Sequence, residues 1–172
     1  MKKLKKVWIL ALLAAGFAMV LGCSNGSSDD NTDEPPAAPN SITVFDPATY
    51  TGDAGKVVDG PDGAKYLEIT PDGYGTSFTI TEVDLSGKTT IKCIVFGKEE
   101  NANAQAVVQL LDADWKNGIT PTLKPIAAAP TEVQAEVGEA KKVAVIQPFT
   151  QSTADWSALK DVTICIGKIT AE

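Results

Sequence analysis

The chain has 172 residues with 22 acidic and 15 basic side chains, a formal net charge of −7 and no His, and every basic residue is Lys. The absence of His excludes imidazole acid–base catalysis, His-ligated metal centres and the Ser-His-Asp hydrolases. The acidic balance and the absence of Arg argue against nucleic acid as a partner, because a polyanion is repelled and the guanidinium fork that reads phosphate or guanine is missing.

Residues 1–22 are typical of a secretory signal peptide. Four Lys among residues 2–6 precede an apolar run over residues 7–21, which is too short for a transmembrane helix. The run ends in Val20-Leu21-Gly22-Cys23, and this stretch resembles the bacterial lipobox. The resemblance implies that Cys23 receives diacylglycerol and fatty acids such as palmitate and becomes the first residue after cleavage. The alternative is an ordinary signal peptide that ends in a Cys by chance.

Residues 23–40 are predicted to be the lipidated Cys followed by a disordered linker. They contain Ser, Asp and Pro but no large apolar side chain, so they cannot bury enough surface to offset chain entropy. Without residues 1–22, 11 Lys remain against 22 acids, a balance of −11, and anionic headgroups repel the folded part. We expect an exported protein that its N-terminal lipid holds at the cell membrane or outer membrane.

Residues 41–172 are predicted to form an antiparallel β-sandwich of about eight or nine strands. Apolar and polar residues alternate in several short runs, for example at Leu67 and Ile69, and Gly- and Pro-containing turns separate these runs. Strands are expected at residues 43–45, 65–70, 76–81, 89–96, 105–111, 132–137, 142–147 and 161–169. A short helix at residues 130–142 is the alternative to one strand, but Gly138 lies in its middle.

A set of motifs in a fixed order suggests a family. In chain order they are Tyr66-Leu-Glu-Ile-Thr, Gly73-Tyr-Gly-Thr-Ser-Phe, Val83-Asp-Leu-Ser-Gly-Lys, Ala106-Val-Val-Gln-Leu-Leu-Asp and Asp155-Trp-Ser-Ala-Leu. Over residues 57–169 this order resembles the jelly-roll, galactose-binding-like carbohydrate-binding modules of bacterial secreted enzymes. The resemblance implies a jelly-roll sandwich that binds carbohydrate. Because it consists of strand and turn chemistry, it bears on the fold more than on the ligand.

The candidate sugar-binding residues are few, because a stacking platform requires an exposed aromatic ring. Trp115 lies in a polar loop after a strand, and Tyr74 lies between two glycines. Tyr66 and Glu68 share one face of a predicted strand. The structural alternatives are rim packing for Trp115, internal packing for Tyr74 and a merely solvated face for the other two. Trp156 is expected to plug one end of the sandwich.

Two pairs of acids are candidates for further roles. Asp112 and Asp114 are two residues apart, a spacing that suits contact with sugar hydroxyls, a hard cation or a catalytic carboxylate pair; solvated loop acids are the alternative. The resembled modules often carry a structural calcium near the first and last strands, where Asp46 and Glu172 are the nearest matches. No other cofactor is expected.

Cys93 and Cys165 are predicted to face opposite sides of a sheet. Cys93 alternates inward with Ile91 and Val95, whereas Cys165 points away from Ile164 and Ile166. An exported protein permits a disulfide, but the opposite facing favours two buried thiols.

The sequence therefore favours a membrane-anchored, non-catalytic lipoprotein that binds carbohydrate or an envelope glycan. The alternative is an envelope adhesion module with a protein partner, which requires an exposed aliphatic patch that includes Ile94 and Phe96. An enzyme that uses Asp112 or Asp114 is disfavoured, because a short sandwich offers no deep cleft that excludes water.

Overall fold

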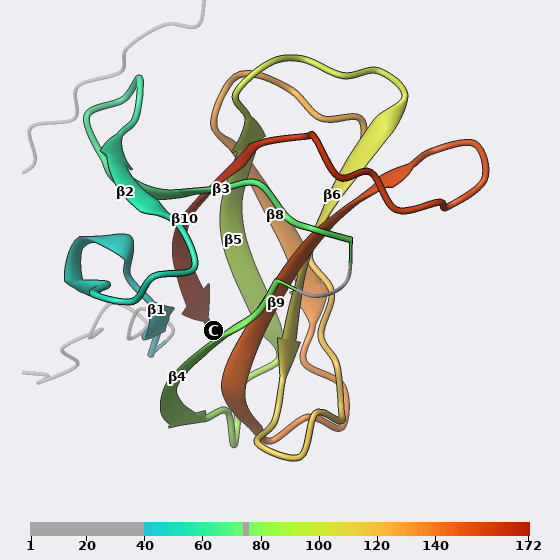
Figure 1. Cartoon of the computed structure of the whole chain (residues 1–172). Helices are drawn as coiled ribbons and strands as arrows, with labels where there is room; N and C mark the ends of the chain where they lie inside the picture. Colours follow the sequence, from blue (N-terminus) through green and yellow to red (C-terminus); the bar gives the residue numbers. More distant parts are fainter. Residues whose placement is uncertain (1–39, 74–75) are drawn as a thin grey trace, which may run out of the picture. The chain divides into compact units, whose positions relative to one another are not determined.

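Ten strands and one short 3-10 helix make up the described part of the chain (Figure 1). The structure is a computed structural model that describes residues 40–73 and 76–172. The predicted signal peptide, Cys23, nearly all of the linker and Tyr74 lie outside these residues, so the predictions made for them stay predictions. No helix in the described ranges has the length and apolar character needed to span a bilayer.

The strands form two antiparallel sheets. The first contains β2 (Lys56–Asp59), β3 (Lys65–Ile69), β10 (Ile164–Ala171), β5 (Thr90–Gly97) and β8 (Thr131–Glu136) in this order, and β1 (Ile42–Phe45) also pairs with β10. The second contains β4 (Phe78–Asp84), β9 (Lys142–Ser152), β6 (Ala104–Leu111) and β7 (Thr122–Leu123). The helix η1 (Pro47–Thr49) follows β1. This arrangement confirms the all-β, antiparallel β-sandwich prediction.

The inward faces of both sheets supply one core. Leu67, Ile91 and Val95 of the first sheet are fully buried in one cluster with Val108 and Leu110 of the second. Alternation along each strand places these side chains on the same face. At about 25 cal/mol per Å² of buried apolar surface, this shared core is the main stabilising term of the domain.

The turn in the motif Val83-Asp-Leu-Ser-Gly-Lys links the two sheets. The carboxylate of Asp84 accepts a hydrogen bond from the backbone N–H of Ser86 (2.8 Å), and the side chain of Leu85 is buried in the core. Gly87 has φ +77°, a conformation that favours glycine. The turn therefore delivers the chain from β4 to β5 across the edge of the sandwich.

Most strand predictions are confirmed, with changes at the ends. The segment weighed between helix and strand is the strand β8, which pairs with β5. The strand predicted at residues 76–81 runs instead over β4, and β9 continues past Gln147 through Pro148 to Ser152. The sequence reading missed β2 and the two-residue β7.

The two internal cysteines are free thiols on opposite faces of the first sheet, as predicted. Cys93 lies in the main core, whereas Cys165 lies in a second cluster on the outer face with Tyr66 and Phe96. Burial raises the pKa of Cys165 to about 11 and that of Cys93 further, so neither thiol ionises readily at neutral pH.

Candidate functional site

A groove of about 760 Å³ runs between the edges of the two sheets. One wall is formed by β1, η1 and the loop at residues 50–53, and the other by β4 and the residues that precede it. Trp115 and Val145 also line it. We call it the Trp115 groove. Its volume lies within the range of about 300–1,000 Å³ that is common for small-molecule sites.

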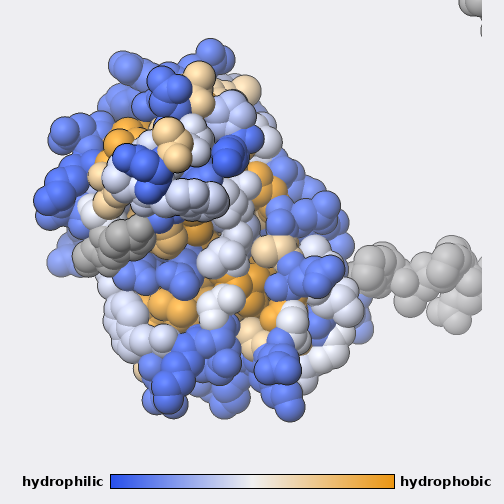
Figure 2. Space-filling model, turned by 90° about the vertical axis from the view of Figure 1, so that its right-hand side faces the viewer, coloured by the Kyte–Doolittle hydropathy of each residue, from blue (hydrophilic) through white to orange (hydrophobic). Residues whose placement is uncertain are grey.

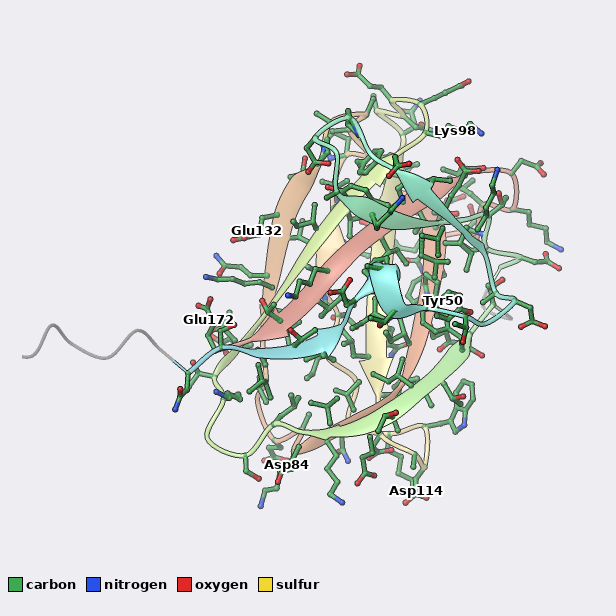
Figure 3. The ribbon with its side chains drawn as sticks, turned by 90° about the vertical axis from the view of Figure 1, so that its left-hand side faces the viewer. Tyr50, Asp84, Lys98, Asp114, Glu132 and Glu172 are labelled. Carbon is green, nitrogen blue, oxygen red and sulfur yellow. The ribbon has the colours of Figure 1, made fainter. Side chains whose placement is uncertain are left out.

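The floor of the Trp115 groove is aromatic. The rings of Phe45, Tyr50 and Phe78 contact one another with centroid distances of 5.2–5.9 Å. Figure 3 shows Tyr50 beside η1, next to β4. The hydroxyl of Tyr50 accepts a hydrogen bond from the N–H of Ala54 (3.0 Å), and a Cβ at Gly52 would collide with the Tyr50 ring. Gly52 is therefore the residue that allows the loop to close over Tyr50.

The rim of the Trp115 groove is rich in hydroxyl groups and carries little charge. The hydroxyl-bearing residues that line it, besides Tyr50, are Thr43, Thr49, Thr51, Ser77, Thr79 and Thr81. Asp46 and Asp53 are the charged residues among the described lining. Asp46 also begins η1, because its carboxylate accepts the N–H of Ala48 (2.9 Å). The groove thus combines an apolar floor with many hydrogen-bonding groups.

Trp115 stands in a loop that Asp112 organises. One Asp112 carboxylate oxygen accepts the backbone N–H groups of Asp114 (3.0 Å) and Lys116 (2.8 Å), and the other accepts the Asn117 side-chain amide (2.7 Å). These bonds, that of Lys116 first, lower the pKa of Asp112. Asp112 therefore has a structural role in this loop, and its assignment as a sugar-contacting acid stays a prediction. Asp114 stays exposed at the end of the molecule opposite Lys98 (Figure 3).

The Trp115 side chain is 52% exposed, as the prediction of a loop platform required. Its φ of +62° is a left-handed conformation that is uncommon for a bulky residue and costs about 1–2 kcal/mol. Trp115 also donates its backbone N–H to the carbonyl of Asp112 (3.1 Å). A strained and half-exposed tryptophan on the wall of a groove is well placed to meet a ligand.

Trp156 is also exposed, which corrects the prediction that it plugs the sandwich. Its side chain is 60% exposed and its φ is +61°. The ammonium of Lys124 lies 5.3 Å from the ring centroid, a cation–π contact. Trp115 and Trp156 are the exposed large apolar residues of the described chain.

The two tryptophan loops share a sequence signal that the alternation of apolar and polar residues does not reveal. Each tryptophan ends the tripeptide Ala-Asp-Trp, at residues 113–115 and 154–156. The first loop follows β6 and the second follows β9, and these strands are antiparallel neighbours. The loops therefore lie at opposite ends of one strand pair.

Between these loops, the outer face of the second sheet carries alternating amide and apolar pairs. Gln105 lies opposite Gln151, and Gln109 lies opposite Gln147, with apolar pairs between and beyond them. Gln105 donates its amide to Gln151 (3.0 Å) in a buried position, whereas Gln109 and Gln147 are half-buried. Figure 2 views the side on which β6 and the loop after β9 lie in Figure 1, and apolar surface there lies recessed between hydrophilic rims.

Tyr66 is not a surface platform, which corrects its place among the sugar-binding candidates. The ring is fully buried and packs edge to face on Phe96 at 4.9 Å. Its hydroxyl donates to the carboxylate of Asp62 (2.7 Å), and burial raises its pKa. The alternation of the strand correctly predicts that Tyr66 lies on the sheet face opposite to Leu67, but it does not predict that Tyr66 is buried there. Glu68, on the same face, forms an ion pair with Lys98 (3.4 Å).

The residues of the aliphatic patch expected for an adhesion module are covered in the same cluster. Phe96 is 7% exposed beneath Tyr66, and Ile94 is half-buried against the same cluster together with Val58. The strand β2 and the turn that follows it, which come directly before Tyr66 in the sequence, bring this cover to Phe96 of β5.

The acids considered for calcium have other partners here. Glu172 forms an ion pair with Lys92 (2.7 Å), and this hydrogen bond raises the pKa of Lys92. Asp46 caps η1. Within residues 40–73 and 76–172, no group of three or more acidic or Cys side chains is arranged to hold a metal ion.

Comparison with known proteins relates the fold to carbohydrate-binding modules. Neither a protein-family model nor a curated protein matches the chain. A family 30 carbohydrate-binding module is 12% identical, with a TM-score of 0.50 over 77% of this chain and 88% of that one. CsCBM6-3 from Clostridium stercorarium in complex with cellobiose is 15% identical, with a TM-score of 0.49 over 77% and 92% of the two chains. The likeness to the family 30 module shows a shared jelly-roll fold, as the motif resemblance implied.

Proposed function

We propose that this protein is a non-catalytic carbohydrate-binding lipoprotein and that the Trp115 groove is its glycan site. The observation that carries the proposal is the exposed, conformationally strained Trp115 on the wall of a hydroxyl-lined groove. The C–H face of a sugar ring carries partial positive charge and stacks on the electron-rich face of an indole. The rim hydroxyls and the two carboxylates then meet the sugar hydroxyls.

The charge of the groove favours an uncharged glycan. Its charged lining among the described residues is Asp46 and Asp53, and the chain beyond residue 22 has a balance of −11. Uronic acid polymers are repelled by this field, whereas neutral chains are not. Carbohydrate binding is also the function in the name of the family 30 module that shares the fold, which is consistent with this proposal.

The anchoring part of the proposal depends on the leader. Lipidation at Cys23 would hold the domain at the cell membrane or outer membrane, with residues 24–40 as a spacer. Seventeen extended residues span about 55 Å at about 3.3 Å per residue. A spacer of this length suits capture of a polymer that lies at a distance from the bilayer.

The experiment that tests the proposal is a screen of glycans and polysaccharides with the full chain in mild detergent. Trp115→Ala and Trp115→Phe are screened in parallel, because Phe retains a ring and Ala does not. We expect binding to neutral polysaccharides, with loss in the Ala variant and partial retention in the Phe variant.

A matched control tests whether an exposed substitution outside the groove affects binding, and the thermal midpoint of Trp115→Ala tests whether that variant is folded. Lys141→Ala changes an exposed residue outside the groove lining and is expected to bind as the unaltered protein does. If no glycan in the screen is retained, or if Trp115→Ala binds as well as the unaltered chain, the proposal is wrong.

A further inference from the structure

Trp156 is a large apolar residue whose exposure the packing of the sandwich does not explain. It is 60% exposed and its φ is +61°. An exposed side chain gains little from burial, while a left-handed backbone at a bulky residue costs about 1–2 kcal/mol. Strain that no packing offsets is a feature of ligand-binding positions.

The backbone around Trp156 is firmly fixed. Trp156 donates its N–H to the carbonyl of Ser152 (3.1 Å), and Ser152 donates to the carbonyl of Ser157 (2.8 Å). The Asp155 carboxylate accepts both the N–H (3.2 Å) and the hydroxyl (2.7 Å) of Ser157. The indole is therefore presented on an ordered turn, so little conformational entropy is lost when a ligand stacks on it.

The same construction is present at Trp115. Both tryptophans follow Ala-Asp, both have φ near +60°, and both donate their N–H to the carbonyl of a residue three or four positions earlier, Asp112 or Ser152. In the first loop Asp112, three residues before the tryptophan, accepts two backbone N–H groups, and in the second Asp155, directly before the tryptophan, accepts one. Two ordered turns that share the tripeptide, the tryptophan φ and the exposed ring point to one kind of ligand.

We propose that Trp156 is a second glycan platform, independent of the Trp115 groove, so that one domain holds a polysaccharide at two points. This inference rests on the proposed function and adds a second site to it. The ammonium of Lys124, 5.3 Å from the Trp156 centroid, supplies hydrogen-bond donors for sugar hydroxyls beside the ring. The Trp115 groove instead offers acceptor carboxylates.

The two platforms are so far apart that a short sugar can contact only one of them at a time. The β6–β9 pairing runs from Ala104 opposite Ser152 to Leu111 opposite Val145, which is about 24 Å at about 3.4 Å per residue. A trisaccharide is too short to reach both rings. A long polymer that engages both gains affinity, because its second contact becomes intramolecular.

The test uses the NMR signals of the indole N–H groups in the ¹⁵N-labelled full chain, dissolved in mild detergent. Cellotriose, xylotriose, laminaritriose and mannotriose are titrated separately, and the signals are assigned with Trp115→Phe and Trp156→Phe. We expect one of these trisaccharides to move both signals, each with its own midpoint. In Trp115→Ala the Trp156 signal should still move with an unchanged midpoint.

A second readout uses the corresponding polysaccharide. Trp156→Ala should weaken polymer binding by a factor of the order of 10² while the Trp115 signal still responds to the trisaccharide. The inference is overturned if the Trp156 signal stays fixed while the Trp115 signal moves, or if Trp156→Ala binds the polymer as tightly as the unaltered chain. If neither signal moves with any probe, the proposed function fails as well.

Discussion

Trp115 and Trp156 have the same left-handed backbone conformation at opposite ends of one antiparallel strand pair. Both rings are more than half exposed. Neither side chain belongs to the buried core. Substitutions at these two positions should therefore affect ligand binding through the lost ring and affect stability through the backbone conformation.

A variant with glycine at either tryptophan position should be more stable than the variant with alanine there. Glycine adopts positive φ without steric cost, whereas alanine retains the strain. We expect Trp115→Gly and Trp156→Gly to exceed the corresponding Ala variants by about 1 kcal/mol in free energy of unfolding, measured with urea. An Ala variant as stable as the Gly variant would show that the loop does not hold this conformation in solution.

The Asp112 carboxylate should make stability and binding depend on pH in the acidic range. Its pKa is lowered in the fold, chiefly by the hydrogen bond from Lys116, so its stabilisation is present above the unfolded value of about 3.9 and is lost as pH falls through the folded pKa. The pKa values of Asp62, Asp84 and Asp155 are lowered as well. Thermal midpoints should therefore fall below about pH 4.

The Asp112→Ala variant tests the contribution of this loop to that pH dependence. Its thermal midpoint should fall less steeply on acidification than that of the unaltered chain, and its glycan binding at neutral pH should be weaker, because Trp115 is no longer held in place. Identical pH profiles of the two proteins would contradict the structural role of Asp112.

The buried Gln105–Gln151 pair should contribute measurably to stability. Gln105 is 1% exposed and donates to Gln151 at 3.0 Å. Replacing it by Ala removes a buried hydrogen bond, which costs about 1–3 kcal/mol. Gln109→Ala, at a half-buried position on the same strand face, is the matched control and should cost less. Chemical denaturation of the two variants gives the comparison, and equal losses would argue against the pair.

The thiols of Cys93 and Cys165 should be unreactive in the folded protein. Both are buried and free on opposite sheet faces, and burial raises the pKa of Cys165 to about 11. In the Cys23→Ser chain, a thiol reagent at pH 8 should label neither cysteine until denaturant is added, and then both without reductant. Fewer than two thiols in denaturant alone would reveal a disulfide.

The lipid anchor is tested by Cys23→Ser. We expect this variant to incorporate no radiolabelled palmitate and to leave the membrane fraction, since the acyl chains supply the anchoring free energy. Cys93→Ser, which changes a core thiol, should retain the label if it folds. A Cys23→Ser chain that still incorporates palmitate contradicts the lipoprotein assignment.

Local pattern was enough to predict the sandwich but not what covers its outer faces. Alternation placed Leu67 inward and Tyr66 outward, and both statements hold. The contact of Asp62 and β2 with Tyr66 belongs to a local hairpin, but the contact of Tyr66 with Phe96 depends on how β3, β10 and β5 pair. The strand β2 was missed for a different reason, since Lys-Val-Val-Asp is too short to show alternation.

Only part of the candidate site could be predicted, because the rest depends on contacts between segments that are separate in the sequence. Trp115 was recognised from its polar loop, and its exposure is confirmed. The sequence predicts packing for Trp156, because composition does not reveal the backbone hydrogen bonds of its turn, from Trp156 to the Ser152 carbonyl and from Ser152 to the Ser157 carbonyl. The repeated Ala-Asp-Trp tripeptide was the available signal. The groove itself unites β1, η1 and β4, and only the folded chain brings these together.

The most direct test of the proposed function is a crystal structure of the protein soaked with the neutral oligosaccharide that binds best in the glycan screen. We expect a sugar ring stacked on Trp115 within the groove, with its hydroxyls toward Asp46 or Asp53. A sugar bound elsewhere with the Trp115 groove empty, at a concentration that saturates the protein in solution, would contradict the account.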